Sequence, residues 1–121
     1  MIEFGFLAPA LFVFVLGIVE GGRMFYVRQS LEYATQQAAR YYMVNPAAAE
    51  SDVTTTLRNA MAGGMGAAIP TPVYDNANPC NGNGNVTCTK ITATYNFVSV
   101  VNILGWGTVQ MNAVAQAVRV Q

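Results

Sequence analysis

The sequence has no histidine, and only 10% of its residues are charged. Histidine is the usual general base near neutral pH and the commonest metal ligand, so both kinds of chemistry have little to build on. The six carboxylates are scattered along the chain, and no glycine motif of the phosphate-binding kind follows a predicted strand. We therefore predict that the chain is not an enzyme and uses no metal or cofactor.

Neither sign of charge is in excess, because six Lys and Arg balance six Asp and Glu. Nucleic acids and anionic membrane surfaces are bound through basic patches, so we expect neither as a partner. Hydrophobic residues instead make up 53% of the chain and are concentrated near its N-terminus. The chain therefore divides into an apolar N-terminal region and at most one small domain.

Cysteine is also scarce, and the two that are present, Cys80 and Cys88, cannot supply the four ligands of a structural zinc site. Gly82 and Gly84 lie between them, so the intervening chain can turn and close a small loop. We predict a disulfide between Cys80 and Cys88, with two free thiols as the alternative. A disulfide implies an oxidising compartment such as the periplasm or the cell surface.

The longest uncharged run is residues 4–19, FGFLAPALFVFVLGIV, which lies between Glu3 and Glu20. As a helix it spans roughly 24 Å, slightly less than the hydrocarbon core of a bilayer. A cleavable signal peptide is disfavoured because no basic residue precedes the run. A simple membrane anchor is also possible, but the nearby arginines all follow the run and place the rest of the chain in the cytoplasm, against the disulfide. Removal of a basic leader before Met1 resolves this conflict, so we expect a mature or truncated form.

Four positions in this region are candidates for contacts between subunits. The carboxylate of Glu3 is costly to bury alone, and either pairs with the α-amino group of a neighbouring copy or rests at the lipid headgroups. Pro9 removes a helical hydrogen bond and favours a kink. Gly17 and Gly21 form a GxxxG pair that permits close helix packing, although membrane helices also tolerate such residues without any special role.

The helical pattern continues to Val44 as an amphipathic stripe with three- and four-residue spacing. Its members are Met24, Val27, Leu31, Ala34, Ala38 and Tyr41 or Tyr42. We assign Ala34 and Ala38 to close contacts with a partner, because alanine lets another surface approach. A helix of about 40 residues is about 60 Å long, more than a small domain covers, so half of it must meet lipid or other subunits.

Residues 45–121, which we call the head, follow residues 1–44 as the second unit. Asn45 is expected to cap a short helix that begins at Pro46 and ends near Gly63. A short strand is expected at Val73 and Tyr74, and longer ones at residues 86–97 and 111–120. In the last strand, one face carries Met111, Ala113, Ala115 and Ala117, and the other carries Val114, Val118 and Val120. We therefore expect both faces to be covered. The predicted fold class is α+β.

Trp106 lies in the apolar stretch between the last two strands, flanked by Gly105 and Gly107. It is either a plug beneath the sheet or a surface contact for a neighbour, and we favour the plug.

The N-terminal half resembles the TadE-like pilins of the tight-adherence (Tad) branch of type IV pili. The resemblance rests on Ile2-Glu3-Phe4, Leu7-Ala8-Pro9, Gly17-Ile18-Val19-Glu20, Gly22-Arg23, Tyr26-Val27-Arg28-Gln29 and Ala38-Ala39-Arg40-Tyr41. The final strand, ending Ala-Val-Arg-Val, is also similar to that family, whereas residues 45–85 show no likeness.

This resemblance implies a structural subunit that is inserted in the inner membrane and then assembled, with copies of itself or related pilins, into an extracellular filament. It also implies removal of a leader by a prepilin peptidase, assembly on an ATPase-driven platform and a role in adhesion. The alternative is a membrane-anchored periplasmic accessory domain that binds a partner without polymerising.

Overall fold

The computed structural model describes residues 2–45, 47–77, 86–100 and 107–120. In chain order the elements are α1 (Ile2–Val44), α2 (Glu50–Ala60), the 3-10 helix η1 (Ala62–Ala68), β1 (Val73–Ala77), β2 (Val86–Val98) and β3 (Thr108–Val120). The predicted α+β class is confirmed, with one long N-terminal helix, a short helix and an antiparallel sheet.

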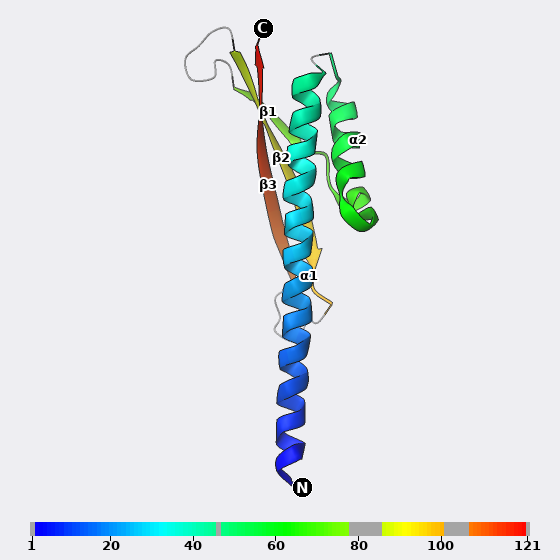
Figure 1. Cartoon of the computed structure of the whole chain (residues 1–121), viewed down its shortest axis with the longest axis vertical. Coiled ribbons are helices and arrows are strands. Elements are labelled where there is room, and N and C mark those ends of the chain that lie inside the picture. Colours follow the sequence, from blue (N-terminus) through cyan, green and yellow to red (C-terminus); the bar gives the residue numbers. More distant parts are fainter. Residues whose placement is uncertain (1, 46, 78–85, 101–106, 121) are drawn as a thin grey trace.

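Helix α1 is continuous over 43 residues, and its N-terminal half extends well beyond the rest of the chain (Figure 1). Pro9 lies inside the helix and does not end it. A proline removes only one backbone hydrogen bond, and the turns on either side keep theirs. The sequence was therefore right to predict one helix through this position.

The C-terminal half of α1 packs against α2 on one side and against β2 and β3 on the other. The predicted apolar stripe is confirmed, because Val27, Leu31, Ala34 and Ala38 are buried and Met24, Tyr41 and Tyr42 are partly buried. They share one core with residues of the other elements, including Val53, Leu57, Ile69, Ile91 and Phe97. The core of the head therefore includes part of the long helix.

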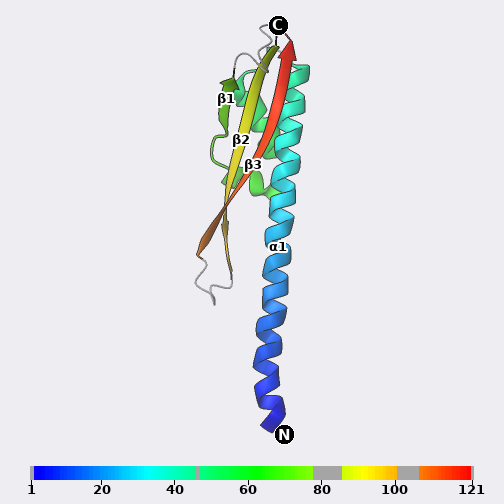
Figure 2. The same ribbon diagram turned by 90° about the vertical axis from the view of Figure 1, so that its left-hand side faces the viewer.

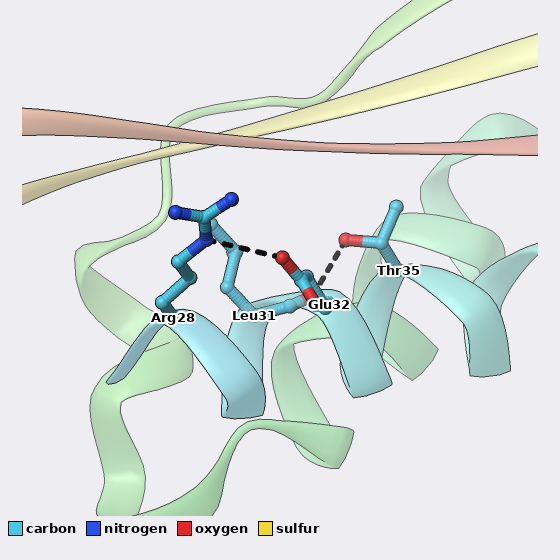
Figure 3. Close-up of polar contacts among 4 residues, drawn as sticks. All are labelled: Arg28, Leu31, Glu32 and Thr35. Atoms are coloured by element: carbon cyan, nitrogen blue, oxygen red, sulfur yellow. Dashed lines mark hydrogen bonds and ion pairs between the residues drawn. The ribbon is translucent and has the colours of Figure 1, made fainter. Parts of the chain in front are cut away.

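Two polar contacts on this part of α1 are made within the helix itself (Figure 3). The exposed Arg28 Nε donates a hydrogen bond to Glu32 Oε1 at 3.2 Å, because residues four apart lie side by side on a helix. The buried hydroxyl of Thr35 donates to the carbonyl oxygen of Leu31 at 2.7 Å. The helix can therefore bury a threonine beside Leu31 without leaving its hydroxyl unpaired.

The second helix begins later than the sequence predicted. Asn45 does not cap it; the Asn45 backbone N–H and side-chain Nδ2 both donate to the Tyr41 carbonyl, at 3.0 Å each, and so close the end of α1. Helix α2 starts at Glu50 after Ala49, which provides no side-chain cap. Glu50 and Asp52 in the first turn supply negative charge at the positive end of the helix dipole instead.

The segment after α2 is joined to α1 by a hydrogen bond and approaches the backbone of α2 closely. The Ala62 N–H donates to Ser30 Oγ at 2.9 Å, which joins η1 to the middle of α1. A Cβ on Gly66 would collide with the Arg58 backbone, so only glycine fits there. Gly63 and Gly64 adopt positive φ angles of 65° and 73°, which glycine tolerates without strain.

The sheet has the order β1-β2-β3, and all of its pairings are antiparallel. The pairing of β2 with β3 extends from Val86↔Val120 to Val98↔Thr108, whereas β1 pairs only with residues 88–92 of β2. The two long strands were predicted from alternation, and β1 was predicted only as a short strand at Val73 and Tyr74. Because β1 is short, the part of the β2–β3 hairpin farthest from the C-terminus of the chain is a two-stranded ribbon (Figure 2).

Only one face of β3 is covered. Met111, Ala113 and Ala117 are buried, while Val114 and Val118 on the opposite face are exposed. The prediction that both faces are covered is therefore wrong. Valine is favoured in strands because its branched side chain suits a pleated, half-buried surface, so valines alone did not identify a second covered face.

Tyr74 connects β1 to α2. Its hydroxyl lies 2.8 Å from the Thr54 hydroxyl and donates to the Glu50 carbonyl oxygen at 3.1 Å. Burial raises the pKa of Tyr74, more than the hydrogen bond with Thr54 lowers it. The neutral phenol is thus the form that the folded head favours, and it links the edge strand to the second helix.

Candidate functional site

The most distinctive surface of the chain is the apolar N-terminal part of α1. This helix is long and apolar enough to cross a membrane, and none of its most apolar 18-residue window is buried within the chain. The large exposed side chains include four phenylalanines, Phe4, Phe6, Phe12 and Phe14. A soluble monomer rarely exposes an apolar surface of this extent, so this segment needs lipid or protein around it. We call residues 4–19 the apolar segment.

Two of the predicted assembly residues, Gly17 and Gly21, are exposed on this part of α1. A Cβ at either position would meet nothing within 4 Å. Pro9 is exposed as well. All three positions are thus accessible to another molecule, as the assembly hypothesis requires, although accessibility does not identify that molecule.

A groove of about 440 Å³ lies where the apolar segment meets the head. It is lined on α1 by Gly21, Met24, Phe25 and Arg28, and on β3 by residues 109–112. Glycine on one wall and methionine and phenylalanine beside it give the groove a mainly apolar lining. It continues the exposed surface of the apolar segment up to the head.

The end of the β2–β3 hairpin is fixed to α1 at the same junction. The Val100 N–H donates to Glu20 Oε1 at 2.9 Å, across 80 residues of sequence. Glu20 also lies 4.0 Å from Arg23, whose guanidinium carbon is 5.1 Å from the centre of the Phe97 ring. At the other end of the sheet, the Arg119 guanidinium lies over the Tyr42 ring at 4.6 Å. The hairpin is therefore held to α1 at both ends.

The role predicted for Ala34 and Ala38 is wrong. Both side chains are 0% exposed because the head of the same chain covers them. They face a core that includes Ala113 and Ala117 of β3, and small side chains on both surfaces let helix and strand approach closely. Neither alanine is available to a neighbouring subunit.

Three other predicted positions are only partly described or not described. Glu3 lies in the first turn of α1, but its side chain is outside the described residues. Cys80 and Trp106 also lie outside them. Cys88 is buried in β2, where its register partners are Ala77 of β1 and Val118 of β3. The disulfide and the role of Trp106 therefore remain predictions.

The junction was not found from the sequence. In the sequence, Glu20 and Arg23 are a pair three residues apart, a spacing that supports a helix and does not point to the hairpin. The available signal was that Glu20 is the first charge after the apolar segment, but its partner, the Val100 amide, lies 80 residues away.

Among the described residues, no cluster of three or more His, Cys, Asp or Glu side chains could hold a metal ion.

Comparisons with known proteins agree with the resemblance seen in the sequence. The family model described as TadE-like protein matches residues 1–40. No curated protein and no solved structure matches the chain. The match covers the apolar segment and most of the rest of α1, and it supports a pilin-like protein associated with the Tad pilus. Together with the exposed apolar helix, it indicates membrane anchoring.

Proposed function

We propose that the chain is a structural subunit of an extracellular Tad-type filament, assembled by packing of its N-terminal helices and used for surface attachment. The observation that carries this proposal is the apolar segment, which projects from the head with no cover of its own. Before assembly the segment lies in the inner membrane, and in the filament its partners are copies of the chain or related pilins. The match to the TadE-like family at residues 1–40 supports the same proposal.

Within this proposal, Gly17 and Gly21 are positions where a neighbouring helix approaches closely. Glu3 pairs with the N-terminus of a neighbour and sets the axial register, and Pro9 weakens the helix where it must adapt from bilayer to filament. Ala34 and Ala38 act inside the subunit instead, by holding the head against α1.

The test is fractionation of cells into membranes and sheared surface material, with mass spectrometry of the main subunit in each. A filament subunit appears in the sheared fraction as an assembly that sediments with fibres seen by negative-stain microscopy. An anchored accessory domain stays in the membrane fraction under all shear conditions, and that result would overturn the proposal.

We also propose that Cys80 and Cys88 form a disulfide, in keeping with a head outside the cytoplasm. Closing so short a loop is expected to stabilise the head by roughly 2–3 kcal/mol. Reduction, or replacement of both cysteines by serine, should lower the urea midpoint of unfolding accordingly. Non-reducing peptide mapping of protein from the cell surface checks the bond directly, and two thiols open to alkylation would rule it out.

A further inference from the structure

The depth of the junction in a membrane follows from its charges. The apolar segment ends at Glu20, and Arg23 follows within one turn of α1. Charged side chains are costly in hydrocarbon, so a membrane-inserted chain keeps Glu20 and Arg23 among the lipid headgroups. The boundary between the acyl chains and the headgroups therefore lies close to Glu20.

The hairpin end is fixed at the same depth. The hydrogen bond from the Val100 N–H to Glu20 Oε1 measures 2.9 Å, and the Arg23 guanidinium lies over the Phe97 ring. These two contacts use different atoms of the hairpin and different residues of α1. Phe97 and Val100 of the hairpin therefore lie at the same depth in the membrane as the end of the apolar segment.

The hairpin end exposes two apolar side chains, Val98 and Val100, beside the polar Ser99 and Thr108. Val98 is 62% exposed and Val100 is 74% exposed, whereas Phe97 beside them is 2% exposed and belongs to the core. On α1, Phe25 and Tyr26 are also exposed, just beyond the junction. Residues 98–108 contain no charged side chain. An exposed apolar end at headgroup depth fits the boundary region of a bilayer, where apolar and aromatic side chains are favoured.

We propose that the end of the β2–β3 hairpin is a second membrane contact, which inserts Val98 and Val100 into the headgroup boundary of the leaflet that faces the head. The contact fixes the head upright against the bilayer, so that α1 is held at two points before assembly. Because the contact carries no charge, it does not depend on anionic lipid or on low salt. It rests on the membrane anchoring in the proposed function, but not on filament formation.

The experiment uses a Trp106→Phe/Thr108→Trp chain, in which the single tryptophan replaces Thr108, the exposed register partner of Val98. The full chain is reconstituted into phosphatidylcholine vesicles that contain lipids brominated either near the headgroup or near the end of the acyl chain. We expect shallow bromines to quench the fluorescence at least about twofold more than deep ones, as for interfacial tryptophan. The quenching should be the same at low and high salt.

A Val98→Asn/Val100→Asn variant should lose most of the shallow quenching while still floating with the vesicles. The matched control, Val114→Asn/Val118→Asn, changes two exposed valines on the outer face of β3 and should quench like the parent chain. Unquenched tryptophan in chains that float with vesicles would overturn the second contact and leave anchoring intact. Quenching that is unchanged in the Val98/Val100 variant would also overturn the proposed membrane contact. Quenching that is absent in vesicles, together with tryptophan shielded from an aqueous quencher in filaments, would overturn it in favour of a contact between subunits. Chains that fail to float would overturn the anchoring itself.

Discussion

Gly17→Leu is expected to abolish filament formation while leaving both membrane insertion and the head intact. Nothing in the chain lies within 4 Å of a Cβ at this position, so the new side chain causes no clash inside the subunit. Lipid accommodates a leucine easily, but a tight helix–helix interface does not. Excess methylenes in a packed interface cost about 1–3 kcal/mol, which is about a 5- to 150-fold loss in each association step. A homopolymer repeats that loss in every subunit.

The measurement is the share of the protein in sheared filaments, with the membrane fraction as the reference. Gly17→Ala is the matched control, because one methyl group should give an intermediate or negligible loss. The urea midpoint of the head should equal that of the wild type in both variants. Normal filament yield from Gly17→Leu would show that this face of α1 is not a close interface between subunits.

Ala38→Leu is expected to have a different effect, namely destabilisation of the head itself. Ala38 is completely buried in a core shared by α1, α2 and the sheet. Three added carbon atoms must push β3 or α2 away from the helix, at a cost of about 1–3 kcal/mol or more. For a unit of this size, each kcal/mol lowers the midpoint of thermal unfolding by about 4–8 °C.

Near-UV circular dichroism of the full chain in detergent follows this unfolding, because several tyrosines and Phe97 pack against the core. Gln36→Leu, two residues away on the exposed face of α1, is the matched control and should leave the midpoint unchanged. If Ala38→Leu unfolds at the wild-type temperature yet fails to assemble, the alanine faces a neighbouring subunit after all, and the packing described here is contradicted.

The contrast between these two positions shows what could be predicted from the sequence. Periodicity correctly identified the stripe that includes Leu31 and Ala38, and alternation correctly located the two long strands. Neither pattern indicates whether the same chain or a neighbouring subunit covers the stripe. Small residues permit close packing against a strand as well as against another helix, so the assignment of Ala34 and Ala38 to an intersubunit contact did not follow from their size.

Other features depended on tertiary structure that no local pattern contains. Asn45 suits a helix start, but its side chain bonds back to Tyr41 at the end of the preceding helix. Glu20 accepts a hydrogen bond from an amide 80 residues away, and only the folded hairpin brings the two together. The apolar segment, by contrast, was predicted in full, because a helix with no internal partners is determined by its own composition.

Site-specific photo-crosslinking at Phe12 tests the central claim most directly. Phe12 is exposed in the middle of the apolar segment, so in a filament it must touch another copy, and in an isolated anchor it can touch only lipid. A benzoylphenylalanine at position 12 should give a ladder of covalent multimers when sheared surface material is irradiated. The same group at Thr55, exposed on α2 far from that segment, is the control for collisions between heads. Monomers bearing only lipid adducts, from position 12 in every fraction, would contradict assembly through the N-terminal helices.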